Sequence, residues 1–587
     1  MKGGSHEVRL KGLGVSPGVV RARVVVRDNS FTEPETFSVR PADFLGERTR
    51  FENALVETRR QIVSLQNQIR ATAGDDADIF DAHLLVLEDH AVLEQVFDKV
   101  AKEGINIESA LYQVFSGYME SLRRVSDPYL KERAVDLGDV MRRILRNLKP
   151  GTGESVADHP VKHPHILAAN DLSPSEIASM DRSLVLACAT EMGSPTSHTA
   201  IIARSLGIPA VVGLHEFDGH FHTGDEVLLD GYNGVVIAHP RAETVEHYAR
   251  FEAEKGAIRD QLNQLVGERA ITLDHQVVVL SSNIEFSHEM DRVRQVGSEG
   301  VGLYRTEFFY LDRPFLPEEH ALLEDYVKVA KGARPHGVII RTLDAGGDKL
   351  PTSIQHGTEH NPFLGWRGIR VCLEESEMFR TQLRAILRAS AEGHVSIMFP
   401  LVSSLEEVLE AKARLEEAKA SLRAEGVPFD DRIPVGVMIE VPSAVMIADV
   451  LAREVDFFSI GTNDLVQYTI AVDRVNERVA GLYAPHHPAI VRMIKRVADA
   501  AAARGIWTGV CGEMAGDVLS TPLLLGLGIT ELSVSPGQIL PVKRAVRALN
   551  CSECQAFAEE MLTLTTVEEI TSRCRELALS RYPELLL

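Results

Sequence analysis

Cysteine, long apolar runs and net positive charge are all scarce in this chain of 587 residues. The six cysteines are scattered, and only Cys551 and Cys554 lie close in sequence, with no second pair to complete a zinc site. We expect that pair to occupy ordinary helix positions. No apolar run approaches about 18 residues, so no membrane-spanning helix is expected. Residues 1–6 lead into no apolar core of the signal-peptide kind.

Basic residues are outnumbered by acidic ones, 62 against 84, which gives a net charge of -22. This balance argues against nucleic acid or an anionic membrane as a partner and favours a cytoplasmic protein that attracts a basic one. The length exceeds what one core accommodates, so several domains are expected.

Proline is absent between Pro41 and Pro128. In that stretch apolar residues recur at helical spacing, and further helical patterns cover 79–100, 107–124 and 129–147. We expect a helical subdomain over 31–149. Before it, the strand-like segment 19–26 has no strand-rich partner until about residue 165. The pattern therefore predicts a discontinuous α/β domain, 1–30 and 150–245, into which the helical subdomain is inserted.

A charged helical segment, 246–270, leads into a second half in which apolar strands come at helix-length intervals. The strands are expected at 277–280, 300–303, 338–340, 395–399, 435–439, 457–460, 508–510 and 532–534. Eight such strands predict a (β/α)8 TIM barrel over 271–587, so the chain as a whole is predicted to be a multidomain α/β protein.

Polar residues follow these strands directly, where the active face of such a barrel lies. They are Arg305 and Glu307, Arg341 and Asp344, Glu440, Asn463 and Asp464, and Cys511 and Glu513. Glu440 and Asp464 offer carboxylate oxygens that suit Mg²⁺. Four arginines, permanently cationic, suit a phosphate and a carboxylate: Arg305, Arg341, Arg367 and Arg474. Together they indicate a small, multiply charged anion as ligand.

His198 stands out among the 21 histidines because Thr196, Ser197 and Thr199 surround it just before an amphipathic helix. Hydroxyls and helix N–H groups there favour a phosphoryl group on the imidazole, although a capping loop with an incidental histidine is the alternative. Cys511 is placed to act as a weak acid towards the anion, with a buried structural thiol as the alternative. Adjacent histidines at 486 and 487, flanked by prolines, are expected to form a loop and not a metal pair.

The chain resembles enzyme I of the bacterial phosphoenolpyruvate-dependent sugar phosphotransferase system. The resemblance begins near Lys11, extends to the C-terminal region and rests on ordered motifs. These are Ser16-Pro17-Gly18, Leu87-Glu88-Asp89, Tyr129-Leu130-Lys131-Glu132-Arg133, Thr196-Ser197-His198-Thr199, Gly302-Leu303-Tyr304-Arg305-Thr306-Glu307, Gly346-Gly347-Asp348-Lys349, Asn361-Pro362-Phe363-Leu364-Gly365-Trp366-Arg367, Met438-Ile439-Glu440, Gly461-Thr462-Asn463-Asp464-Leu465 and Cys511-Gly512-Glu513-Met514-Ala515.

The resemblance implies a phosphotransferase with a nitrogenous acceptor. Phosphoenolpyruvate would phosphorylate His198 on Nε2, the group would pass to a histidine of the carrier protein HPr, and pyruvate would be released. Glu440 and Asp464 would hold Mg²⁺, and Cys511 would protonate the enolate carbon. The residues implied to bind phosphoenolpyruvate are Arg305, Arg341, Arg367, Asn463, Asp464 and Arg474. The resemblance also implies a homodimer formed through the barrel.

Two positions depart from the family pattern. The family carries Gly-Gly-Arg where this chain has Gly193-Ser194-Pro195, and an arginine of the HPr-facing surface where this chain has Gly138. The first departure bears on the rate or on the carrier contact, and the second on the carrier contact. Pyruvate phosphate dikinase and phosphoenolpyruvate synthase, the nitrogen-related enzyme I and a non-catalytic scaffold are the rival interpretations. We expect no room for the added ATP-binding or sensory domain, and the intact set of barrel residues argues against a scaffold.

Overall fold

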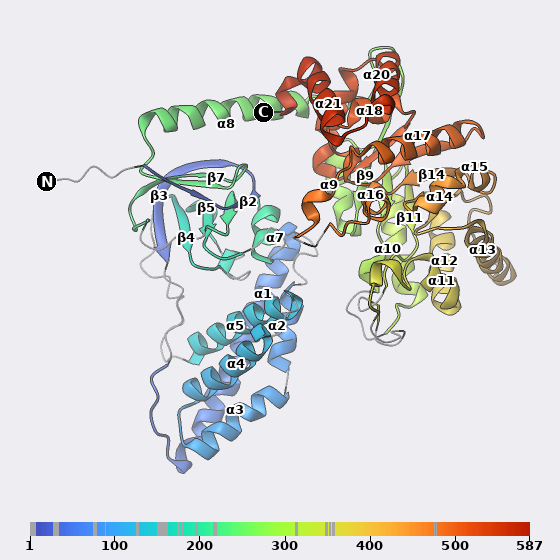
Figure 1. Cartoon of the computed structure of the whole chain (residues 1–587). Helices are drawn as coiled ribbons and strands as arrows, with labels where there is room; N and C mark the ends of the chain where they lie inside the picture. The colour runs from blue at the N-terminus through green and yellow to red at the C-terminus, as the bar shows by residue number, and fades with distance from the viewer. Residues whose placement is uncertain are drawn as a thin grey trace. The chain divides into compact units, whose positions relative to one another are not determined.

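The computed structural model describes residues 7–27, 34–73, 79–88, 90–124, 128–148, 163–172, 176–177, 180–193, 198–214, 220–310, 315–346, 350–351, 354, 359–474, 476 and 478–586. The chain divides into two compact units, Met1–Lys255 and Gly256–Leu587 (Figure 1). Each unit has hydrophobic clusters of its own.

The first unit contains an eight-stranded mixed sheet in the order β1-β8-β7-β3-β4-β5-β6-β2. Its strands are β1 (Val8–Lys11), β2 (Leu13–Ser16), β3 (Val19–Arg27), β4 (His165–Ala169), β5 (Val185–Thr190), β6 (Ala210–Val212), β7 (Glu226–Asp230) and β8 (Val235–Ala238). Strand β3 runs parallel to β4 and antiparallel to β7. The N-terminal strands are therefore part of the same sheet as strands that follow more than 130 residues later, as the strand pattern predicted.

Five α-helices are found among the described residues between β3 and β4, with the short η1 (Pro41–Asp43) before them. They are α1 (Phe44–Ala73), α2 (Ile79–Glu88), α3 (His90–Glu103), α4 (Ile107–Arg124) and α5 (Pro128–Leu148). Phe51 and Ile62 of α1 and Phe115 of α4 are fully buried, which is the expected apolar stripe. Gly138 of α5 lies where α4 comes close, because a Cβ there would be 3.2 Å from Met119 Sδ.

The second unit is built on a closed barrel of eight parallel strands, which confirms the prediction from strand spacing (Figure 1). The strands are β9 (Val279–Ile284), β10 (Val301–Tyr304), β11 (Gly337–Arg341), β12 (His394–Phe399), β13 (Val435–Ile439), β14 (Phe457–Ile460), β15 (Trp507–Val510) and β16 (Glu531–Val534). Pairing of β16 with β9 closes the ring. All eight lie within a few residues of the expected segments.

Helices surround the barrel and bury the outward-facing strand residues. They are α9 (Met290–Gln295), α10 (Glu319–Gly332), α11 (Ile369–Glu374), α12 (Ser376–Ser390), α13 (Leu405–Glu425), α14 (Pro442–Met446), α15 (Ala448–Leu451), α16 (Thr462–Ile470), α17 (Pro488–Ala502), α18 (Thr521–Gly526), α19 (Ile539–Arg547), α20 (Cys551–Thr563) and α21 (Val567–Arg581). Short 3₁₀ turns include η6 (Pro362–Leu364), η7 (Ala480–Leu482) and η8 (Glu513–Ala515). A separate inner cluster fills the barrel: Leu303, Ile339, Met398, Met438, Phe457 and Cys511. The interior is thus packed, and the ligand site has to lie at an end of the barrel.

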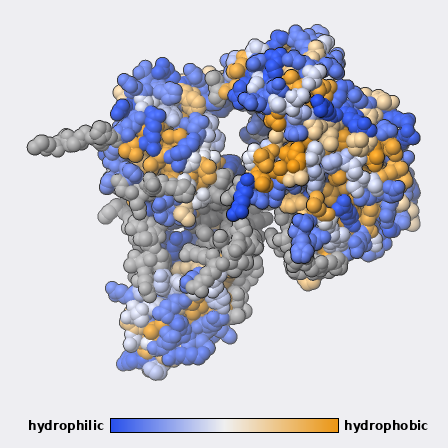
Figure 2. Space-filling model, in the orientation of Figure 1, coloured by the Kyte–Doolittle hydropathy of each residue, from blue (hydrophilic) through white to orange (hydrophobic). Residues whose placement is uncertain are grey.

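Two further helices lie among the described residues. In the first unit, α7 (His198–Ser205) follows β5. Helix α8 (Ala242–Asn263) contains the boundary between the two units. No helix among the described residues is both long and apolar enough to span a bilayer. The face seen in Figure 2 is largely hydrophilic with interspersed apolar areas.

Candidate active site at the barrel mouth

The carboxyl ends of the barrel strands, here called the barrel mouth, carry the predicted polar residues. Arg341 ends β11, Asp344 follows it, and Glu440 follows β13. Asp464 lies in the first turn of α16, directly after β14. Arg367 precedes α11, and the isolated bridge between Gly346 and Arg367 holds it next to the loop after β11. Parallel strands bring their carboxyl ends to one rim, which is why segments over 120 residues apart meet here.

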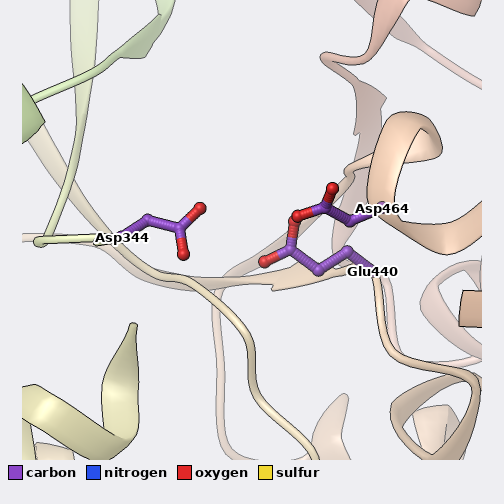
Figure 3. Close-up of side chains that lie close together, drawn as sticks. All are labelled: Asp344, Glu440 and Asp464. Carbon is purple, nitrogen blue, oxygen red and sulfur yellow. The ribbon is translucent and has the colours of Figure 1, made fainter. Parts of the chain in front are cut away.

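Three carboxylates form the centre of the site (Figure 3). One oxygen each from Asp344, Glu440 and Asp464 lies within 4.8 Å of the others. In Figure 3 the carboxylates of Glu440 and Asp464 lie next to each other, and that of Asp344 points towards them. Burial, and then the charges of Asp344 and Asp464, raise the pKa of Glu440 well above its usual range. Oxygen ligands that repel one another at this spacing suit a divalent cation such as Mg²⁺.

Two buried arginines pair with the carboxylate cluster. Arg341 Nη1 lies 2.9 Å from Asp344 Oδ2, and its Nη2 donates to Glu307 Oε1 over 2.9 Å. Arg367 Nη2 lies 3.1 Å from Asp344 Oδ1 and 3.2 Å from Asp464 Oδ2. Only 10% of either arginine side chain is exposed. Positive charge is therefore fixed directly beside the candidate metal ligands, in a setting that strengthens electrostatic interactions with an anion.

The other two predicted arginines are more open to solvent. Arg305 pairs with Glu285, and 38% of its side chain is exposed. Arg474 Nη1 lies 3.1 Å from Glu513 Oε1, and 40% of its side chain is exposed. Asn463 joins this second pair, because its Oδ1 accepts a 2.8 Å bond from the N–H of Glu513. Glu285 and Glu513 are themselves exposed. An entering anion can therefore replace them as partners of the two arginines at little cost in free energy.

Cys511 follows β15 and faces the inside of the barrel, where it is 3% exposed. Burial raises the pKa of its thiol to about 11, and a hydrogen bond with Ser459 lowers it in part. The thiol therefore stays protonated at neutral pH. A protonated thiol on which the charges of Glu440 and Arg341 act is able to donate a proton to a ligand bound there.

His198 is the first residue of α7 in the first unit, so its backbone lies within the first turn of that helix and not on the loop before it. Ala200 and Ile202 are fully buried and fix the helix on the sheet domain. The preceding residues 194–197, with the departure at Pro195, lie outside the described residues, as does the His198 side chain.

Two further acidic residues complete the site beyond the predicted set. Sequence reasoning placed Asp344 and Glu307 after their strands but gave neither a role. Asp344 bridges both buried arginines, and Glu307 Oε1 accepts from Arg341 and from the N–H of Asp344, 3.1 Å away. The sequence signal for both was an acidic residue close to an arginine just after a strand, because an arginine that is buried there requires a carboxylate partner.

The two adjacent histidines bind different protein groups. His486 Nε2 lies 2.8 Å from Ser520 Oγ, while His487 Nδ1 caps α17 by accepting from the N–H of Ala489. Cys551 and Cys554 occupy the first turn of α20, again as expected.

Comparison with known proteins identifies the family. Three family descriptions match in order: PEP-utilising enzyme, N-terminal, over residues 11–133; PEP-utilising enzyme, mobile domain, over 161–234; and PEP-utilising enzyme, PEP-binding domain, over 259–551. The phosphoenolpyruvate-protein phosphotransferase of Bacillus subtilis (strain 168) is 42% identical and covers 97% of this chain and 99% of its own. The enzyme of Priestia megaterium is 41% identical over 96% of this chain and 97% of its own length. The enzyme of Staphylococcus carnosus (strain TM300) is 41% identical over 97% of this chain and 99% of its own length. The chain therefore belongs to the phosphoenolpyruvate-protein phosphotransferases, a family of PEP-utilising phosphotransferase enzymes.

Proposed function

We propose that this enzyme moves the phosphoryl group of phosphoenolpyruvate to Nε2 of His198 and then to a histidine of the carrier protein HPr, as the first general step of sugar phosphotransfer. The observation that carries this proposal is the barrel mouth itself. Three carboxylates within 4.8 Å of one another lie beside two buried arginines. This combination can bind a multiply charged anion together with a metal ion.

Glu440 and Asp464 would hold Mg²⁺, which when bound would offset the charge of the phosphate and enolate oxygens. The substrate's phosphate and carboxylate would be bound by Arg341 and Arg367 from the inside and by Arg305, Arg474 and Asn463 from the more exposed side. Asp464 would take part in both the metal site and the substrate site. Most of the catalytic effect would then be positioning and charge stabilisation.

The transfer is a displacement at phosphorus. The neutral imidazole of His198 provides the electron pair that forms the new N–P bond. The P–O bond to the enol breaks, and its electron pair stays on the enolate oxygen. Cys511 then gives the thiol proton to the methylene carbon, which yields pyruvate, and the thiolate recovers a proton from solvent. The raised pKa of Cys511, about 11, supports this role because the proton is present at neutral pH.

Several finer features belong to the same proposal. HPr is the expected acceptor, the barrel is the expected dimer interface, and the cytoplasm is the expected location. The net charge of -22 supports a basic carrier. The domain limits expected from the sequence also stay predictions. If phosphorylated enzyme fails to label HPr from its own cell, the acceptor is wrong while the first half-reaction stands.

The direct experiment is incubation with [³²P]phosphoenolpyruvate and Mg²⁺, comparing wild type with His198→Ala. Wild type should acquire a label that is lost in acid and kept in base, as expected of phosphohistidine, and His198→Ala should acquire none. Equal labelling of both proteins would refute the assignment of His198. ATP-dependent phosphorylation of pyruvate would instead favour the dikinase or synthase interpretation.

A further inference from the structure

A fully buried glutamine lies in the apolar layer between the barrel and its helices. Gln382 is on α12, is fully buried, and has the apolar neighbours Phe379, Leu383 and Ile386 on the same helix, all fully buried as well. A buried amide lowers stability unless its polar atoms are hydrogen-bonded. An apolar side chain would pack here without that requirement, so the amide has to be explained by what it binds.

Both ends of the amide bind loops of the barrel mouth. Oε1 accepts a 3.1 Å hydrogen bond from the N–H of Leu343. Nε2 donates to Thr306 Oγ1 over 3.0 Å and to Tyr326 OH over 3.2 Å. The hydroxyl of Thr306 donates in turn to the carbonyl of Arg341 over 2.9 Å. All these groups lie in buried residues, so water does not compete for the bonds.

The two loops joined in this way are those that carry substrate-site residues. Thr306 lies between Arg305 and Glu307 after β10, and Leu343 directly precedes Asp344 after β11. On the other side of the same backbone, Glu307 accepts from both Arg341 and the N–H of Asp344. The loops are therefore held together from the mouth side by an ionic contact and from the outer side by Gln382.

We propose that Gln382 is a positioning residue for phosphoenolpyruvate binding, which sets the spacing of the loops after β10 and β11 through Leu343 and Thr306. This inference rests on the proposed function. Because Gln382 is fully buried, it would contact neither substrate nor metal. Its effect is indirect and comes from the positions of Arg341 and Asp344. The guanidinium of Arg341 has to lie within a fraction of an ångström of its position for binding the anion, and Asp344 has to hold the arginines there.

The test compares Gln382→Met with Ser390→Ala in isotope exchange between pyruvate and phosphoenolpyruvate. Methionine keeps the length of the side chain and removes its hydrogen bonds. Ser390 is a matched control, because it is buried on the same helix but binds the N–H of Asp430, in the segment before β13, over 2.8 Å. We expect Gln382→Met to raise the KM for phosphoenolpyruvate or lower kcat/KM by about 10-fold or more. Ser390→Ala should stay within about twofold of wild type, at a comparable loss of thermal stability.

Thr306 provides a second test that does not depend on Gln382→Met folding. Thr306→Val keeps the shape and loses the hydroxyl that links Gln382 to Arg341, whereas Thr306→Ser keeps the hydroxyl. We expect the valine variant to lose at least about fivefold more exchange activity than the serine variant. Equal activities of these two variants, or a Gln382→Met variant with the KM and kcat/KM of Ser390→Ala, overturn the role of Gln382 alone. Absence of exchange in wild type overturns the proposed function and this inference together.

Discussion

The backbone N–H of Leu401 donates a 2.6 Å hydrogen bond to Oε1 of Glu440, and Leu401 does so with a φ of 53°. A non-glycine residue in this left-handed region costs about 1–3 kcal/mol. Both residues are buried. The bond fixes one oxygen of Glu440 and leaves the other for the carboxylate cluster, so backbone strain accompanies the orientation of a candidate metal ligand.

The second oxygen of Glu440 is limited by Gly461. A Cβ on Gly461 would lie 2.7 Å from Glu440 Oε2, closer than such atoms approach. Because Leu401 holds the first oxygen, Gly461→Ala should push Glu440 away from Asp464 and raise the Mg²⁺ concentration needed for half-maximal isotope exchange by about 10-fold. Gly481→Ala is the control, since nothing lies within 4 Å of that position. Equal Mg²⁺ requirements in the two variants would contradict the geometry proposed for Glu440.

Asp344 and Glu440 should respond differently to loss of charge. Both oxygens of Asp344 already pair with guanidinium groups, at 2.9 Å from Arg341 and 3.1 Å from Arg367. Asp344→Asn should therefore disturb the arginines and raise the KM for phosphoenolpyruvate by about 10-fold, with a smaller change in Mg²⁺ requirement. Glu440→Gln should mainly raise the Mg²⁺ requirement. Isotope exchange titrated separately with substrate and with Mg²⁺ measures both. A Mg²⁺ effect that dominates in Asp344→Asn would make Asp344 a metal ligand.

The barrel could be predicted because its signal is local and repeated. Each strand from β9 to β16 is a short apolar run separated from the next by a helix, and eight repeats leave few alternatives. The active face followed from polar residues at strand ends. Which carboxylate pairs with which arginine could not be predicted from the sequence. Asp344 bridges Arg341 and Arg367, and this depends on how the loops after different strands converge.

The N-terminal strands show the opposite case. With three glycines and a proline, segment 12–18 has the composition of a turn. Leu13–Ser16 is nevertheless strand β2, paired antiparallel with β6. A Cβ on Gly14 would collide with the carbonyl oxygen of Gly231. Glycine here allows two backbones to approach closely and does not mark a turn, and a single sequence does not distinguish these uses.

Glu531 should make stability depend on pH. Its carboxyl group accepts a 2.5 Å hydrogen bond from Ser281 inside the barrel, and burial raises its pKa from 4.5 to about 7. The folded state thus binds the proton more tightly than the unfolded state. The associated stability is complete below about pH 4.5 and is lost as pH rises through about 7. Glu531→Gln should match wild type at pH 5 and be more stable at pH 8 by about 1–3 kcal/mol.

Urea unfolding followed by tryptophan fluorescence suits this measurement. The chain has two tryptophans, Trp366 and Trp507, and both belong to the second unit. Glu425→Gln serves as a contrast of opposite sign, because the hydrogen bond from Arg384 lowers the pKa of Glu425 to about 2. That variant should lose stability at pH 8. If Glu531→Gln is less stable than wild type at pH 8, the ionised carboxylate of Glu531 does not lower the stability of the folded state, and the prediction is wrong.

Ala471 offers a way to stabilise the helix that carries Asn463 and Asp464. It is the exposed C-cap residue of α16 and has a φ of 55°, where a Cβ is unfavourable. Ala471→Gly should stabilise the second unit by about 1 kcal/mol, since relief of this strain exceeds the added chain entropy of glycine. Ala503→Gly is the matched control, because Ala503 is an exposed C-cap of α17 with a φ of -63°. There glycine relieves nothing and should destabilise by a few tenths to about 1 kcal/mol. The two replaced alanines differ in backbone conformation, left-handed at Ala471 and right-handed at Ala503. Unfolding midpoints that shift in the same direction in both variants would show that Ala471 is not strained.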